Sequence, residues 1–137
     1  MWEQNLQSRD GGDDTPRVVL IVDDEAATRK LLRSTIKRLP LQCQIFEAVD
    51  GDAALQIARG KRLDLALIDI VLPGSSVSGV LVCQELCKSL ETKVVIVSGQ
   101  ASDAIIRSCI SLGALDHIRK PFTIDDIRGK LERWLTE

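Results

Sequence analysis

The stretch Val18-Val19-Leu20-Ile21-Val22-Asp23-Asp24 decides the fold of this chain. Its first five residues are apolar and mostly β-branched, which is typical of a strand buried on both faces of a parallel sheet. The run stops at two acidic residues. We therefore expect a buried strand whose carboxyl end delivers two carboxylates to one edge of a sheet.

The same kind of apolar run recurs along the chain, separated each time by a helical pattern. Strand-like runs lie at residues 43–48, 63–68, 94–97 and 115–118, and helical patterns lie at 25–39, 51–59, 79–90, 101–113 and 123–135. Leu32, Ile36 and Leu39 share one face of the first predicted helix. Strict alternation of strand and helix predicts an α/β fold, a doubly wound (βα)5 unit with a parallel five-stranded sheet.

Composition limits the classes of function. The chain has 137 residues and a formal net charge of -2, with 45% hydrophobic residues, so we expect one globular domain with no bulk attraction to nucleic acid or anionic membranes. No apolar run approaches the roughly 20 residues of a membrane span. Residues 1–17 are polar and lack the pattern of a secretory signal, which predicts a flexible tail on a cytoplasmic domain at 18–137.

The four cysteines suggest packing and not chemistry. Cys43, Cys83, Cys87 and Cys109 form no CxxC pair, and each lies in an apolar segment. We expect small buried side chains in a reducing compartment.

Polar residues stand where the predicted strands end. The first strand ends in Asp23-Asp24, the third in Asp69, the fourth in Ser98 and the fifth in Lys120-Pro121. Parallel sheets place their ligands beyond the carboxyl ends of the strands, so these side chains should meet on one rim. Clustered carboxylates need a cation, and all-oxygen ligands suit Mg²⁺. A carboxylate nucleophile beside an ammonium, a hydroxyl and a metal predicts a site for a transferred phosphoryl group.

Each of these residues also has a purely structural interpretation. Asp24 and Glu25 could supply the cap and first-turn charge of the following helix. Lys120 alone could be a surface lysine, and Ser98 alone a turn residue. Asp69 has no such alternative, because it ends a buried apolar strand with no helix start of its own.

The segments Val22-Asp23-Asp24-Glu25, Leu67 to Gly74, Val97-Ser98-Gly99 and Lys120-Pro121-Phe122 together resemble the receiver domain of bacterial response regulators. The resemblance spans residues 17–137 and implies a flavodoxin-like strand order of 2-1-3-4-5.

The resemblance also implies a role for each site residue. Asp69 would accept a phosphoryl group from a sensor histidine kinase or a histidine phosphotransfer protein, assisted by Lys120 and Ser98. Mg²⁺ would be bound by Asp24, Asp69 and the backbone carbonyl of Val71, with Asp23 acting through water. The Lys120–Pro121 bond would be cis.

The switch residues include one departure from the family. Ser98 would be the switch hydroxyl, and His117 stands where the family usually has Tyr or Phe. His117 is either a switch residue coupled to Ser98 or an exposed edge-strand histidine with no switching role. Val71 and Gln100 flank the site, and the apolar Val71 predicts a slowly decaying acyl-phosphate.

Downstream function is expected to depend on protein contacts. In the family, phosphorylation remodels the fourth helix, fifth strand and fifth helix, here residues 101–135, so we expect a protein target or a weak phosphorylation-dependent dimer there. No helix-turn-helix, zinc pattern or basic patch is apparent, so we predict no direct nucleic-acid binding and a stand-alone signalling domain that is not an enzyme.

The alternative is a receiver-like interaction module that needs no phosphate. A haloacid-dehalogenase-type phosphatase would need an acid at Val71. A flavin carrier would need a phosphate-binding loop after the first strand, where this chain has Asp-Asp-Glu, and aromatic residues to enclose the flavin ring, whereas only 3% of this chain is aromatic.

Overall fold

The computed structural model describes residues 15–137, so the prediction of a flexible tail falls largely on residues outside the described part. The chain alternates strand and helix throughout this range. The elements are β1 (Arg17–Val22), α2 (Ala26–Lys37), β2 (Cys43–Ala48), α3 (Gly51–Ala58), β3 (Leu65–Ile68), α4 (Gly79–Leu86), β4 (Lys93–Ser98), α5 (Asp103–Leu112), β5 (Asp116–Arg119) and α6 (Ile124–Thr136).

The described strands form one parallel five-stranded sheet in the order β2-β1-β3-β4-β5. This confirms both the predicted fold class and the predicted strand order. The register aligns Val22 of β1 with Ile68 of β3, so Asp23 and Asp69 follow neighbouring strands at the same level. The strand order switches between β1 and β3: β2 is added on one side of β1, and β3, β4 and β5 are added on the other. Folds of this kind bind ligands at such a switch point, beyond the carboxyl ends of the strands.

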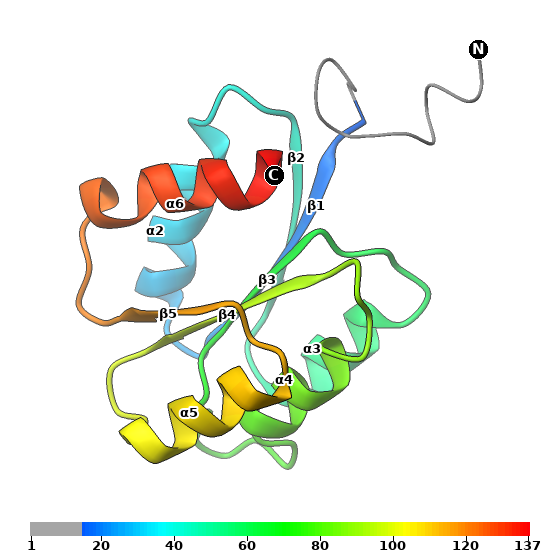
Figure 1. Cartoon of the computed structure of the whole chain (residues 1–137), viewed down its shortest axis with the longest axis vertical. Coiled ribbons are helices and arrows are strands. Elements are labelled where there is room, and N and C mark those ends of the chain that lie inside the picture. The colour runs from blue at the N-terminus through cyan, green and yellow to red at the C-terminus, as the bar shows by residue number, and fades with distance from the viewer. Residues whose placement is uncertain (1–14) are drawn as a thin grey trace.

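Helices cover both faces of the sheet. Figure 1 shows α2 and α6 on one side and α3, α4 and α5 on the other. Alternate residues of β1 face the two layers: Val19 and Ile21 pack with the α2 and α6 side chains, whereas Leu20 and Val22 pack with the opposite layer. Burial on both faces is the physical reason for the unbroken apolar runs in the central strands.

The helix ends follow from capping chemistry. Asp50, Ser78 and Ser102 each accept a backbone N–H in the first turn of the next helix, and Thr123 forms a capping box with Asp126.

The prediction that the third helix extends to residue 90 is wrong. Helix α4 ends at Leu86, after which Lys88, Ser89 and Thr92 donate to carbonyls three residues earlier. These tighter turns redirect the chain toward the sheet, where Lys93 N donates to Asp64 O at 3.0 Å.

The amino end of the sheet is tied to the last turn of α6. Arg17, the first residue of β1, is buried, and its Nε donates to Leu135 O at 2.8 Å. Lys93 Nζ donates to Trp134 O at 2.7 Å. The last carbonyls of a helix lack intrahelical donors, so two cations close this helix end.

The cysteines are free, and Cys83 and Cys109 are buried while Cys43 and Cys87 are half-buried. Cys83 Sγ lies 3.8 Å from Cys87 Sγ, and burial raises the pKa of the Cys83 thiol well above its usual value. Within residues 15–137 no helix has the length and apolar character needed to cross a membrane.

Candidate phosphoryl-transfer site

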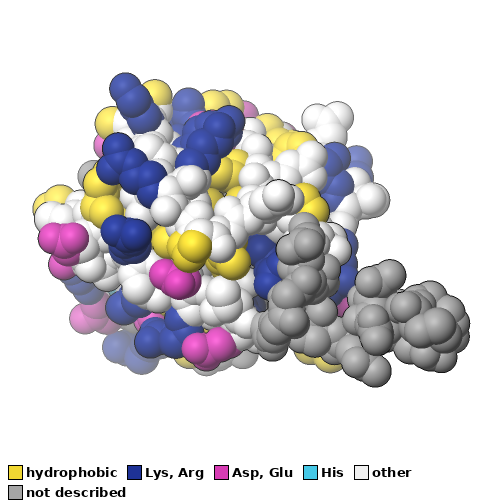
Figure 2. All heavy atoms as spheres, turned by 90° about the horizontal axis from the view of Figure 1, so that it is seen from above, with side chains coloured by type: hydrophobic (Ala, Val, Ile, Leu, Met, Phe, Trp, Pro, Cys, Tyr) yellow, Lys and Arg dark blue, Asp and Glu magenta, His cyan; other side chains and the backbone are white. Residues whose placement is uncertain are grey.

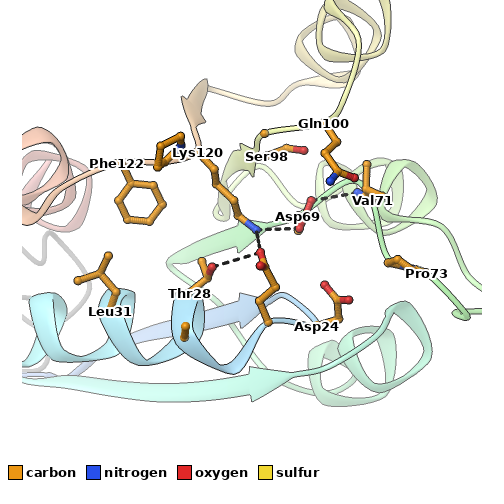
Figure 3. Close-up of a pocket in the computed structure, with 14 residues that line it drawn as sticks. Asp24, Thr28, Leu31, Asp69, Val71, Pro73, Ser98, Gln100, Lys120 and Phe122 are labelled. Carbon is orange, nitrogen blue, oxygen red and sulfur yellow. Dashed lines mark hydrogen bonds and ion pairs between the residues drawn. The ribbon is translucent and has the colours of Figure 1, made fainter.

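A pocket of about 580 Å³ opens at the carboxyl ends of the strands, and it contains most of the predicted site (Figure 3). The lining comes from the ends of β1, β3, β4 and β5 or the loops that follow them, and from the first turns of α2. Its residues are Asp24, Glu25, Ala27, Thr28, Leu31, Asp69, Val71, Pro73, Ser98, Gly99, Gln100, Lys120, Pro121 and Phe122. Segments separated by about a hundred residues therefore meet here because parallel strands end on the same rim.

Three carboxylates gather at this pocket, two of them in its lining. Oxygen atoms of Asp23, Asp24 and Asp69 all lie within 4.8 Å of one another. Asp23 and Asp69 are buried and Asp24 is exposed. Burial raises the pKa of the Asp23 carboxyl, although the Lys120 ammonium and the Glu25 N–H act in the opposite direction. Like charges at this spacing repel, so the cluster requires positive charge beside it.

The Lys120 ammonium supplies part of that charge. Its Nζ lies 2.7 Å from Asp23 Oδ2, 2.8 Å from Glu25 Oε1 and 2.9 Å from Asp69 Oδ2. Burial alone would lower the pKa of Lys120, but the hydrogen bonds to the three carboxylates raise it above its usual value. Lys120 is therefore a cation at neutral pH. It follows β5 directly, and its bond to Pro121 is cis.

Asp69 is held at the end of β3 by its own loop. Its Oδ1 accepts the Val71 N–H at 3.0 Å, while Oδ2 accepts from Lys120. Gly79, the first residue of α4, presses on this turn from behind: a Cβ there would lie 2.5 Å from Asp69 O and Ile70 Cα. Close packing of backbone against backbone thus positions the carboxylate.

The Glu25 side chain does not cap α2, which the structural interpretation of this residue had allowed. Glu25 is the N-cap residue of α2, but its side chain makes no capping hydrogen bond in the described chain. Asp23 Oδ1 instead accepts the Glu25 N–H at 2.9 Å. The Glu25 carboxylate reaches Lys120, whose hydrogen bond lowers the pKa of that carboxyl.

Ser98 ends β4 with a buried hydroxyl that lacks a hydrogen-bond partner among residues 15–137. A buried hydroxyl without a partner is costly, so it indicates a site prepared for a further group. His117 is half-buried, and its Nε2 lies 3.2 Å from Ser98 O. The alternative prediction that His117 is an exposed histidine is wrong, because the residue is half-buried. A switching role for His117 stays a prediction.

The oxygen-rich cluster fits Mg²⁺. Three carboxylates with ligand atoms this close match a hard cation that prefers oxygen, and the repulsion among them explains why a cation would be favourable. Asp24, Asp69 and the Val71 carbonyl remain the predicted direct ligands, with Asp23 acting through water.

Several lining residues were not anticipated from the sequence. Leu31 and Phe122 are apolar lining residues, and Thr28 lines the pocket with a hydroxyl that donates to Glu25. Gly99 leaves room for the lysine stem, because a Cβ there would lie 3.2 Å from Lys120 Cβ. Gly99 and Phe122 had a recognisable signal, since they stand in the segments Val97-Ser98-Gly99 and Lys120-Pro121-Phe122, whereas Thr28 and Leu31 had none.

The comparisons with known proteins agree with this geometry. The family model of the response regulator receiver domain matches residues 19–132. The chain is 34% identical over 118 residues to sporulation initiation phosphotransferase F of Bacillus subtilis, covering 85% of this chain and 92% of that protein.

Other relatives are longer or are solved receiver structures. The chain is 31% identical to the probable transcriptional regulator ycf27 of Guillardia theta but spans 45% of its length. The crystal structure of the receiver domain of NtrX from Brucella abortus superposes with a TM-score of 0.75 at 33% identity, covering 85% of this chain and 97% of that one. By motif order, fold, site geometry and family match, the chain belongs to the response regulator receiver domain family.

Proposed function

We propose that this protein accepts a phosphoryl group on Asp69 from the phosphohistidine of a histidine kinase or phosphotransfer protein. The observation that carries the proposal is the convergence on one pocket of Asp69, the Lys120 ammonium 2.9 Å away and the Ser98 hydroxyl, which has no hydrogen-bond partner within the described residues. These are a nucleophile, a cation and a hydrogen-bond donor, the groups that phosphoryl transfer requires.

In the proposed reaction, one Asp69 oxygen forms a bond to phosphorus as the bond from phosphorus to the histidine nitrogen breaks. The electron pair of that bond stays with the departing imidazole, which takes up a proton. Lys120 pairs with a phosphoryl oxygen, and Ser98 donates its free hydroxyl to another. Mg²⁺, held by Asp24, Asp69 and the Val71 carbonyl, would neutralise the charge of the carboxylates and the phosphoryl oxygens.

The signal would leave through the surface formed by α5, β5 and α6, which is the predicted fourth helix, fifth strand and fifth helix. Ser98 is the last residue of β4, which pairs with β5, and the contact of His117 with Ser98 O gives a route into β5. The surface includes exposed apolar side chains on α5, Ile105 and Leu112, and in the loop that follows, Leu115. A protein target or a weak phosphorylation-dependent dimer would bind there.

The experiment is phosphorylation with acetyl phosphate and Mg²⁺, measured as the intact mass. The expected result is the gain of one phosphoryl group, absent in Asp69→Asn and absent when a chelator removes Mg²⁺. The asparagine is nearly isosteric but is not a carboxylate nucleophile. If no donor produces an adduct in the wild-type protein, the proposal is wrong and the phosphate-independent interaction module replaces it.

A further inference from the structure

Of the three carboxylates that contact Lys120, Glu25 is the only one that can leave at low cost. The side chains of Asp23 and Asp69 are 1% and 8% exposed, whereas that of Glu25 is 59% exposed. Asp23 is also held by the Glu25 N–H. A swing into water would cost Glu25 little solvation, while the other two carboxylates would have to break buried contacts.

Glu25 has no other role that explains its position. It makes no capping bond to α2 within the described residues, and it is outside the cluster of oxygens that could hold a metal. Its remaining side-chain contact is a long one of 3.5 Å from Thr28 Oγ1. Its contact with the Lys120 ammonium, at 2.8 Å, is therefore the main interaction of this side chain within residues 15–137.

The ammonium has three N–H donors; it donates to Glu25 Oε1 and Asp69 Oδ2, and Asp23 Oδ2 lies 2.7 Å from the same nitrogen as an ion pair. A phosphoryl group on Asp69 needs one of these donors for its oxygens. We propose that Glu25 is a positioning residue that holds Lys120 in the unphosphorylated protein and must release it when the phosphoryl group arrives, so that Glu25 slows phosphorylation. The inference rests on the proposed function of Asp69.

Charge at the pocket mouth acts in the same direction. The Glu25 carboxylate lines the pocket through which an anionic donor must approach Asp69. Like charge lowers the local concentration of such a donor, and salt screens this effect. Competition for Lys120 and repulsion of the donor both predict that neutralising Glu25 accelerates the reaction.

The test is Glu25→Gln, which keeps the size of the side chain and leaves Lys120 with two carboxylates. The variant is incubated with Mg²⁺ and acetyl phosphate. In the reaction an Asp69 oxygen forms a bond to phosphorus while the bond from phosphorus to the acetate oxygen breaks, and acetate leaves with that electron pair. We expect phosphorylation of Glu25→Gln to be about threefold faster than that of wild type at low ionic strength. This ratio corresponds to the free energy that an exposed ion pair typically contributes. At 1 M KCl, where the Debye length is about 3 Å, the ratio should fall toward one.

A matched control is Glu91→Gln, the same change of charge at an exposed residue that pairs with Arg62 and does not line the pocket. Its rate should equal that of wild type. A second readout needs no reaction: beryllofluoride, a non-reacting mimic of the phosphoryl group, should bind Glu25→Gln with Mg²⁺ about threefold more tightly, as measured by calorimetry.

The outcomes separate this inference from the proposed function. If wild type and Glu25→Gln both remain unphosphorylated, the proposed function itself fails. If wild type is phosphorylated but Glu25→Gln is equally fast or slower, or if its acceleration is insensitive to salt, the inference about Glu25 is overturned and the role of Asp69 stands.

Discussion

The two ends of the sheet use lysine in opposite ways. At the amino end, Lys93 Nζ donates to Trp134 O, a backbone carbonyl at the last turn of α6. At the carboxyl end, Lys120 Nζ contacts three carboxylates, which are its ion-pair partners within residues 15–137. A lysine bound to backbone completes the fold, because the carbonyl cannot move away. A lysine bound to side chains in a pocket can exchange them for a ligand.

The surroundings differ as well. Figure 2 looks onto the molecule from the top of Figure 1, and Lys and Arg side chains project into solvent over this side. Lys120, by contrast, has a side chain that is only 15% exposed. Charges that project into solvent are screened by water, whereas those around Lys120 act on one another in a partly buried pocket, and this second arrangement is the one suited to chemistry.

The largest expected effect separates the two lysines by rate. Lys120→Met should slow phosphorylation by acetyl phosphate about 100-fold, the loss typical of removing one charged group that stabilises the transition state. Lys93→Met should leave the rate within about twofold of wild type, since it contacts α6 and not the pocket. Intact mass followed over time measures both rates. A rate for Lys120→Met near that of wild type would contradict the idea that Lys120 acts in phosphorylation and Lys93 does not.

Backbone packing behind the site gives the next effect. Gly79→Ala should lower the free energy of unfolding by about 2 kcal/mol, because its Cβ would overlap Asp69 O and Ile70 Cα. The matched variant is Gly129→Ala in α6, where a Cβ meets nothing within 4 Å in the described chain; it should raise stability by about 0.5–1 kcal/mol. Urea denaturation measures the free energy of unfolding of both variants. If both substitutions changed it in the same direction, the contact of Gly79 with the turn behind Asp69 would not be tight.

At the amino end we expect an effect on stability alone. Lys93→Met should lower the free energy of unfolding by about 1.5 kcal/mol, because it leaves the Trp134 carbonyl without its charged donor. Lys88→Met removes an exposed lysine paired only with Glu85 and should change stability by less than about 0.5 kcal/mol. Indistinguishable denaturation midpoints for the two variants would mean that the lysine does not stabilise the end of α6.

The smallest effect concerns decay of the acyl-phosphate. Val71 lines the pocket with an apolar side chain that cannot orient water, although Gln100 lies in the same pocket. Val71→Asn should accelerate hydrolysis about threefold, a change of roughly 0.7 kcal/mol in the barrier. Loss of the phosphoryl mass over time in Mg²⁺ measures the rate. An unchanged lifetime would remove Val71 as its determinant.

The sequence was sufficient for the residues at strand ends. Asp23, Asp24, Asp69, Ser98 and Lys120 could be placed on one rim because parallel strands all end at the same edge, whatever the details of packing. The same reasoning predicted the sheet, since buried apolar runs and their alternation with helices leave few other arrangements.

Features that depend on long side chains or on distant backbone could not be predicted. Glu25 precedes Lys120 by 95 positions, and only the folded loops show that its side chain contacts the ammonium and does not cap α2. Lys93 finds Trp134 O through the docking of α6 on the sheet, which leaves no local pattern. The early end of α4 at Leu86 depends on turns whose apolar and polar residues also suit a helix.

The hydrogen bond from Arg17 to Leu135 O has a consequence for anything joined to this domain. It brings the first residue of β1 beside the end of α6, on the edge of the sheet that lies away from Asp69 (Figure 1). β1 has six residues, so about 20 Å of strand separates this edge from the site. A domain joined directly to either end would therefore be attached about one strand length from Asp69, so a signal that reaches the attachment point has to pass along the sheet or over the surface between them.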